Sequence, residues 1–180
     1  DGRITQSATV FAIDMKTGPG SSNSLVSSFP VGTWSSFIGD MTAFDRNLDY
    51  RTDVVYFGRT IQDTTPTVGP PWRGKVYRLT MGETLPFGGV TAPGSWGVAD
   101  SGDRVPTEML DTIGVSSPVE MGPVLAAPSI SVDDAAKAWV FVGSGRYFGA
   151  ADKTDKSTQY FVGMKDSVIN GGCTQVSWGS

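Results

Sequence analysis

The chain lacks histidine altogether and has a single cysteine among its 180 residues. The absence of histidine excludes Ser-His-Asp and Cys-His catalysis, and it excludes zinc sites that use histidine ligands. Cys173 has no possible disulfide partner within the chain, so it is either a free thiol or half of a disulfide with a cysteine outside it. Cysteine pairing therefore gives no information on the redox compartment.

Charge is also sparse, because Asp, Glu, Lys and Arg make up only 18% of the residues. The net charge is −4 and the basic residues do not cluster, which argues against nucleic acid as a partner. No stretch reaches the roughly 20 consecutive apolar residues of a membrane-spanning helix. We therefore expect neither a nucleic-acid partner nor a membrane span.

The chain is rich instead in glycine, proline and aromatic residues. It has 23 Gly and 11 Pro, aromatic residues make up 11%, and a hydrophobic content of 39% is enough for a sizeable core. This composition is typical of β-structure with many turns, and the length is that of one domain. The composition therefore predicts an all-β fold with long loops.

Short runs of β-branched and aromatic residues between Gly- and Pro-rich turns predict where the strands lie. Strands are expected near residues 8–13, 54–58, 75–79, 138–142 and 159–164, with another at 121–130 as the hairpin partner of 137–143. Residues 18–28 and 82–105 are expected to be loops. A single helical turn is the most that 106–115 is expected to hold, and no helix longer than three turns is expected.

A degenerate internal repeat organises these strands. The segments ATVFAIDMKTG, TDVVYFGRTI with RGKVYRLTM, and KAWVFVGSGRYFG with TQYFVGMKD each combine a β run, an aromatic residue and a turn. Such a repeat is typical of a β-propeller with long insertions, and it predicts that Val55–Gly58 and Gly74–Leu79 are adjacent strands of one blade. Only two to three blades fit in the chain, whereas roughly four to eight close a propeller.

We therefore expect residues 1–180 to form part of a propeller that other polypeptide completes. Unclosed sheets leave unpaired backbone groups and apolar faces at both ends. The segment Ala8–Asp14 is accordingly expected to pair with, or pack on, polypeptide outside this chain. Val10, Phe11, Tyr160 and Phe161 are expected to be open to water in the isolated chain.

The segment from Asp45 to Asp53 carries the strongest functional signal. Asp45, Asn47, Asp49 and Asp53 occupy loop positions 1, 3, 5 and 9, directly before a hydrophobic strand. Alternate oxygen ligands in a tight loop suit Ca²⁺, which takes six to eight oxygens at roughly 2.3–2.6 Å. The backbone carbonyl of Arg51, at position 7, is the expected fifth ligand. The sequence therefore predicts a calcium site.

This loop differs from an EF-hand, which has Gly at position 6 and a bidentate Glu at position 12. Tyr50 and Tyr56 stand at those positions here, so the predicted site is a shorter loop that Asp53 closes. The alternative is an Asp-rich turn without metal, since Asp and Asn favour turns in any case. Asp152 and Asp155 pose the same choice, and for them the turn interpretation is favoured.

The five tryptophans, by contrast, are too dispersed for a sugar-binding platform. Most of them are expected to lie in the core between blades.

Several of these segments together resemble the C-terminal β-propeller of PilY-type, type IV pilus tip-associated adhesins. The family has an Asp/Asn calcium loop that runs into a D-x-V-Y-x-G strand, followed by G-x-[VL]-[WY]-[RK]-[FL] and by G-[ST]-G-R-Y-[LF]-G-x-x-D. The corresponding segments here are Asp53–Gly58, Gly74–Leu79 and Gly143–Asp152. Phe11–Gly18 is similar to the family's A-[LI]-D-x-x-T-G turn, which quinoprotein-like propellers share.

The resemblance covers most of residues 8–166 and implies a non-enzymatic protein. Such adhesins are extracellular, lie at the pilus tip or cell surface with the minor pilins, and contact host or abiotic surfaces. They support adhesion, twitching motility and pilus extension, and calcium occupancy is linked to extension and retraction. The resemblance implies the same ligands as the spacing: Asp45, Asn47, Asp49, the Arg51 carbonyl and Asp53.

Two alternatives remain beside this interpretation. The first is a quinoprotein-like dehydrogenase, which the shared blade turn suggests, although the repeated Trp-docking signature is missing and no catalytic base can be named. The second is a scaffold propeller without metal. Metal analysis and the absorption spectrum of a bound quinone separate the three functions.

Overall fold

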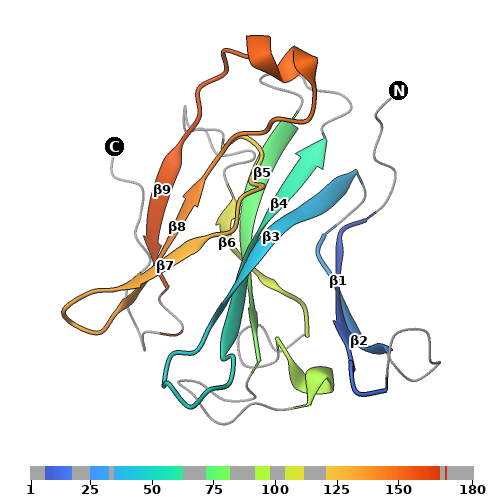
Figure 1. The fold of residues 1–180 in the computed structure, drawn as a ribbon, viewed down its shortest axis with the longest axis vertical. Coiled ribbons are helices and arrows are strands. Elements are labelled where there is room, and N and C mark those ends of the chain that lie inside the picture. The colour runs from blue at the N-terminus through green and yellow to red at the C-terminus, as the bar shows by residue number, and fades with distance from the viewer. Residues whose placement is uncertain are drawn as a thin grey trace.

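A computed structural model describes residues 7–17, 25–32, 35–62, 72–81, 92–97, 104–111, 121–166 and 169. These residues form three antiparallel sheets (Figure 1). The first sheet pairs β1 (Thr9–Ile13) with β2 (Leu25–Pro30). The second contains β3 (Ser36–Phe44), β4 (Val54–Gln62), β5 (Trp72–Thr80) and β6 (Thr107–Asp111) in that order. The third contains β7 (Ser129–Val132), β8 (Ala138–Gly143) and β9 (Phe161–Lys165).

The four-stranded sheet is the middle layer, with β7–β9 on one side and β1–β2 on the other (Figure 1). Two short 3₁₀ helices, η1 (Pro93–Ser95) and η2 (Ala150–Thr154), lie outside the sheets. The described residues contain no helix with the length and hydrophobicity that a membrane span requires. The all-β prediction is therefore confirmed for the described part of the chain.

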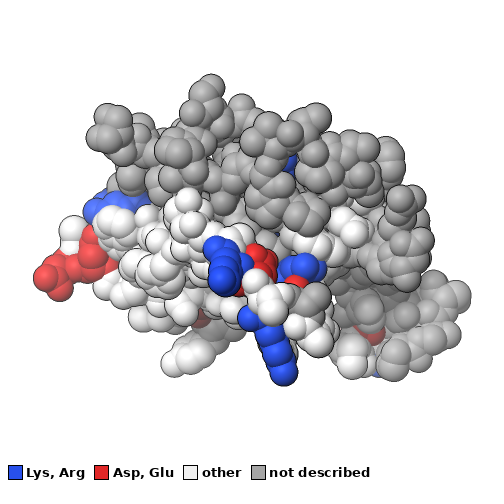
Figure 2. Space-filling view, turned by 90° about the horizontal axis from the view of Figure 1, so that it is seen from above, with Lys and Arg blue, Asp and Glu red and all other residues white. Residues whose placement is uncertain are grey.

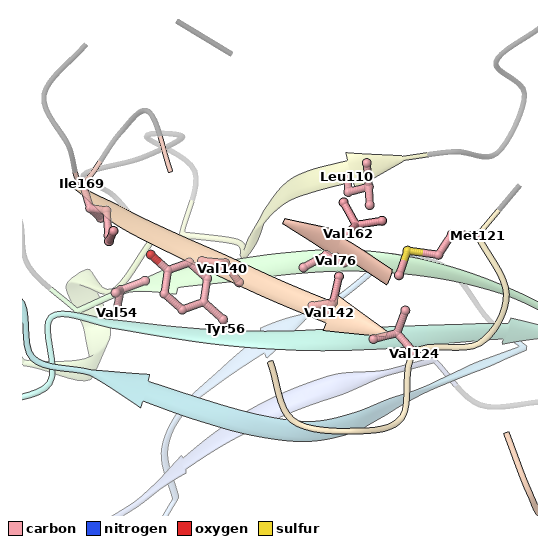
Figure 3. Close-up of a cluster of buried hydrophobic side chains, with 11 residues drawn as sticks. Val54, Tyr56, Val76, Leu110, Met121, Val124, Val140, Val142, Val162 and Ile169 are labelled. Carbon is pink, nitrogen blue, oxygen red and sulfur yellow. The ribbon is translucent and has the colours of Figure 1, made fainter. Parts of the chain in front are cut away.

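Each face of the middle sheet supports its own hydrophobic core. The core toward β7–β9 is drawn in Figure 3 and contains Val54, Tyr56, Val76, Leu110, Met121, Val124, Ala138, Val140, Val142, Val162 and Ile169. The core toward β1–β2 contains Ala8, Ala12, Phe29, Val31, Phe57, Tyr77, Leu79 and Met81. Successive residues of a strand point to opposite faces, so β4 and β5 supply both cores: Val54, Tyr56 and Val76 lie in the first, and Phe57, Tyr77 and Leu79 in the second.

The segment 121–125 lies so close to the middle sheet that glycine is required beneath it. A Cβ at Gly58 would lie 2.3 Å from Val124 Cγ1, and a Cβ at Gly74 would lie 2.1 Å from the Gly122 carbonyl oxygen. The Gly74 N–H donates a hydrogen bond to the Met121 carbonyl at 2.9 Å. Glycine thus allows a second backbone to approach the sheet closely.

A buried ionic contact joins the middle sheet to the β7–β9 sheet. Asp166, directly after β9, is fully buried, and Arg78 of β5 is 6% exposed. The carboxylate lies 2.5 Å from Arg78 Nη1 and accepts a hydrogen bond from the Tyr56 hydroxyl at 2.8 Å. The Ile169 N–H adds a third donor at 3.3 Å. A buried charge is tolerated only when it is paired and hydrogen-bonded in this way.

The predicted strands are confirmed at residues 9–13, 54–58, 75–79, 138–142 and 161–164, and several extend further than expected. The predicted pair within one sheet is also confirmed, because Phe57 of β4 lies opposite Tyr77 of β5. Their rings stack with centroids 5.9 Å apart.

Three local predictions are wrong. Most of 121–130 is irregular, because Pro123 and Pro128 cannot donate to a ladder, and only Ser129 onward pairs with β8. A strand, Thr107–Asp111, replaces the helical turn at 106–115, because β5 offers a free edge to pair with. Part of the predicted loop 18–28 belongs to Leu25–Pro30, which pairs with β1 despite its serines.

The first strand does not depend on outside polypeptide for pairing, since β1 pairs with β2 of the same chain. Its outer face nevertheless remains open, with Phe11 and Ile13 more than half exposed. Phe161 is 76% exposed on the opposite outer sheet, whereas Val10 and Tyr160 are half-buried. Cys173 lies outside the described residues.

We expect Asp166→Ala to lower the free energy of unfolding by about 3–5 kcal/mol, because it removes one partner of a buried, hydrogen-bonded ion pair. Urea unfolding of both proteins measures the difference. The control is Asp134→Ala, an exposed turn residue whose replacement should change stability by less than about 0.5 kcal/mol. Equal losses in the two variants would contradict the role given to Asp166.

Candidate metal centre

The predicted calcium loop connects β3 to β4 at one end of the middle sheet, at the lower edge of Figure 1. The two strands hold its base, since Phe44 lies opposite Val54 in the ladder. The Asp53 N–H donates to the Phe44 carbonyl at 3.0 Å, and the Asp53 carbonyl accepts from the Met81 N–H at 2.8 Å. The loop therefore begins and ends on a rigid base.

The carboxylate of Asp45 organises the first half of the loop. Its Oδ1 accepts hydrogen bonds from the N–H groups of Leu48 at 2.7 Å and Asp49 at 3.3 Å. Its Oδ2 accepts from the Tyr50 N–H at 2.8 Å. One side chain thus binds three successive backbone donors, which folds the chain back around the carboxylate.

The other predicted ligands continue this pattern with one donor each. Asn47 Oδ1 accepts from the Asp49 N–H at 3.0 Å, and Asp49 Oδ1 accepts from the Arg51 N–H at 3.0 Å. Asp53 Oδ2 accepts from the Arg46 N–H at 2.7 Å, so the last loop residue is tied to the second. Every predicted side-chain ligand therefore accepts a backbone hydrogen bond from within the loop, although Asn47 and Asp49 remain exposed.

Two residues of the loop have left-handed backbone conformations. Leu48 has φ +61° and Tyr50 has φ +68°, although neither is glycine. Tyr50 occupies position 6, where calcium loops use Gly for the sharp turn. The chain thus makes this turn with a residue for which it is unfavourable by roughly 1–2 kcal/mol.

The donor set suits a hard cation, because it consists of carboxylate, amide and carbonyl oxygens. Within the described residues, however, no group of three or more His, Cys, Asp or Glu side chains converges closely enough to hold a metal ion. The structure therefore brings Asp45, Asn47, Asp49 and Asp53 into one loop without gathering their oxygens around a common centre. Arg51 is exposed, and its N–H is engaged with Asp49.

Arg46 attaches the loop to the neighbouring sheet. Its Nη2 donates a hydrogen bond to the carbonyl of Ala136, in the turn between β7 and β8. The guanidinium therefore extends toward that turn. The same turn contains Asp133, a carboxylate that the sequence analysis did not single out.

Asp133 holds the β7–β8 turn together. It accepts hydrogen bonds from Trp139 Nε1 at 3.0 Å and from the Lys137 N–H at 2.9 Å, and Lys165 Nζ lies 3.1 Å away. The Trp139 hydrogen bond, followed by the Lys137 one, holds the pKa of Asp133 well below its ordinary value. This stabilisation is present above the unfolded-state pKa and is lost as the pH falls toward the folded-state pKa.

Asp152 and Asp155 act in turns, as the favoured interpretation predicted. Asp152 Oδ2 accepts from the N–H groups of Phe148 and Gly149, and Oδ1 lies 2.8 Å from Arg146 Nη2. Asp155 accepts from the Ser157 N–H, which lowers the pKa of Asp155. Figure 2 looks down on the end that carries η2, where the described charges of opposite sign lie side by side.

The described tryptophans are only half-buried, although most of the five were expected in the core. Trp96 does pack against the core toward β1–β2, where its ring stacks with that of Phe29 at a centroid distance of 5.8 Å. Trp34 and Trp178 lie outside the described residues. Trp139 stacks with Phe141, which in turn stacks with Phe161, at centroid distances of 6.2 and 6.0 Å. These three stacked rings lie on the outer face of their sheet, because Val140, between Trp139 and Phe141, points into the core. The alternation of residues in β8 is the sequence signal for this arrangement.

No protein-family model matches this chain, and no curated protein or solved structure matches it either. The resemblance to pilus tip adhesins therefore remains one of sequence motifs.

We expect Tyr50→Gly to be more stable than Tyr50→Ala by about 0.5–1 kcal/mol, because both remove the exposed ring but only glycine accepts φ +68° without steric cost. Thermal and urea unfolding in a calcium-free buffer measure the difference. A glycine variant no more stable than the alanine variant would show that the left-handed turn at this position is not strained.

Proposed function

We propose that this chain is a calcium-binding segment of a type IV pilus tip adhesin of the PilY kind, and that it contributes part of a β-propeller rather than an active site. The observation that carries the proposal is the loop from Asp45 to Asp53. Its oxygen-bearing residues have the spacing that is typical of calcium loops, and Tyr50 at position 6 has a left-handed backbone conformation. The loop leads directly into the buried strand β4.

The propeller part of the proposal is supported by the stacking of the sheets. Three antiparallel sheets lie face to face, and the middle one has the four strands in sequence order that a blade requires. Both outer layers still present large apolar side chains, Phe11 and Ile13 on β1 and Phe161 on β9. We propose that further blades, from the remainder of the polypeptide or from other chains, cover these faces.

The calcium part depends on how the loop residues respond to a cation. The second oxygens of Asp49 and Asp53 accept no hydrogen bond among the described residues, so they remain available as ligands. Asp45 and Asn47 would supply side-chain oxygens that the loop backbone already orients. The Arg51 carbonyl would be the fifth ligand. A bound calcium ion would offset the repulsion between the carboxylates and hold the β3–β4 connection.

In this proposal the protein is exported and acts at the pilus tip or cell surface. It would lie with the minor pilins, support pilus extension, and contact a host or abiotic surface. Its calcium-dependent loop and its propeller scaffold would be the parts on which that role depends.

A metal-free scaffold is the second candidate, and one observation favours it. The carboxylates of the loop already accept backbone hydrogen bonds and do not converge on one point. A turn stabilised in this manner is complete without metal. Measurement of calcium binding decides between the two candidates.

We expect the chain to bind one Ca²⁺ in isothermal titration calorimetry and to gain thermal stability with calcium, by about 2.7 kcal/mol when free calcium is a hundred times the Kd. Asp49→Ala should abolish both effects, because it removes a ligand from the centre of the loop. Asp134→Ala, an exposed carboxylate of the β7–β8 turn, should leave both unchanged. Absence of calcium binding by the unaltered chain would support the scaffold candidate instead.

The biological part of the proposal is tested in the bacterium that makes the protein. We expect the double variant Asp45→Ala/Asp49→Ala, placed in the full-length gene, to reduce surface pili and twitching zones while protein abundance stays normal. Electron microscopy and stab-agar assays measure the two effects, with Asp134→Ala as the matched control. Normal piliation and motility in the double variant would remove the link between this loop and pilus function.

A further inference from the structure

One edge of the β7–β9 sheet is open. β9 pairs with β8 on one side, and none of the described strands pairs with its other side (Figure 1). This sheet has three strands, whereas the middle sheet has four. An open edge presents unpaired backbone N–H and C=O groups, to which another extended strand can add.

The hydrogen bonds at the two ends of the β8–β9 ladder show which backbone groups face this edge. The Tyr160 carbonyl accepts from the Ser144 N–H at 2.8 Å, and the Asp166 N–H donates to the Ala138 carbonyl at 3.3 Å. Backbone groups of successive residues point to opposite sides of a strand, so every second residue between these ends faces away from β8. These residues, whose outward backbone groups have no hydrogen-bond partner in the described part of the chain, are Phe161, Gly163 and Lys165.

The usual devices that protect an edge strand are missing from β9. Proteins blunt such edges with proline, with a bulge or with a charged side chain. β9 contains no proline, and its ladder with β8 has no bulge. Its charged residue, Lys165, is held over its own sheet, because Nζ lies 3.1 Å from Asp133 and 4.7 Å from the centroid of the Trp139 ring. Phe161, at the other end of the strand, is 76% exposed.

The side chains of β9 indicate that a second copy of this strand fits the edge. In antiparallel pairing about a two-fold axis at Gly163, Phe161 lies opposite the partner's Lys165 on the outer face. An exposed aromatic ring thus meets a lysine side chain. On the inner face Val162 lies opposite the partner's Met164, so that each core-facing residue meets an apolar one. The sequence of the strand is therefore self-complementary in this register.

Gly163 limits the size of the residue that can lie opposite it. A Cβ at this position would lie 2.8 Å from Phe141 Cε1, so the Phe141 ring covers the glycine on the outer face. A strand with a large outward side chain at this point would meet that ring, whereas a second Gly163 leaves room for it. The Phe141 rings of the two copies would then lie beside each other, an arrangement that stabilises paired strands.

We propose that β9 pairs edge to edge with β9 of a second copy, which joins two sheets of three strands into one continuous sheet across a two-fold axis. β9 has five residues, far fewer than the roughly 20–30 a side of a standard interface, so the dimer is weak and depends on concentration. The pairing uses the edge of the sheet rather than its faces. It requires neither the calcium site nor the further blades proposed above.

Analytical ultracentrifugation of the chain over the micromolar range measures this association. We expect a monomer–dimer equilibrium without larger species, because pairing about a two-fold axis closes on itself. Phe161→Lys should raise the dimer Kd by about tenfold or more, because it places like charges opposite each other at both ends of the paired strands. Phe161→Glu should retain the dimer, because it faces the partner's Lys165 with the opposite charge. Tyr147→Lys adds the same charge at another exposed aromatic residue and should leave the Kd unchanged.

The matched pair of variants separates edge pairing from association through the outer face of the sheet. Both variants remove the Phe161 ring, so association through the face would be lost equally in the two, and an equal loss would overturn the proposal. A chain that remains monomeric over the whole range would overturn it as well. Hydrogen exchange gives a second readout, because the amides of Phe161, Gly163 and Lys165 should exchange more slowly as the dimer forms. Unchanged exchange at these amides in a dimer would show that another surface is used.

Discussion

The fully buried carboxylate of Asp166 is the constraint on which the arrangement of the sheets depends. It follows the last strand of one sheet and binds Arg78 and Tyr56 of the next, so neither sheet can move without breaking this buried ion pair. The surrounding contacts are mostly Val side chains, which pack well but specify alignment weakly. The ionic contact therefore fixes how the β7–β9 sheet lies on the middle sheet, and glycines at the interface allow the close approach.

The Asp-rich loop depends on that scaffold for its shape. β4 is buried on both faces, and the loop enters it directly, so the position of Asp53 is set by the core rather than by the loop. Asp45 then controls the remainder by binding three backbone N–H groups. The side chains that shape the turn are the proposed calcium ligands. Metal binding and loop conformation would therefore be coupled. A change in calcium occupancy would alter the backbone at Leu48 and Tyr50, whose N–H groups bind Asp45.

The sequence predicted the features that arise from local pattern. The runs that became β4, β5 and β8 are rich in β-branched and aromatic residues, and the turns between them are rich in Gly and Pro. Features set by distant contacts were missed. Thr107–Asp111 is a strand because β5 had an open edge, and Val124 lies in the core although its segment has no strand. The candidate site was predicted residue by residue from its spacing, whereas the exposure of Leu48 and the pairing of Asp166 with Arg78 follow only from the fold.

The central claim is that residues 45–53 enclose a cation. A crystal structure of the chain grown with calcium, with an anomalous difference map, tests it most directly. The account predicts a single peak at roughly 2.3–2.6 Å from side-chain oxygens of Asp45, Asn47, Asp49 and Asp53 and from the Arg51 carbonyl. A well-ordered loop that keeps its present hydrogen bonds and shows no peak at saturating calcium would contradict the claim.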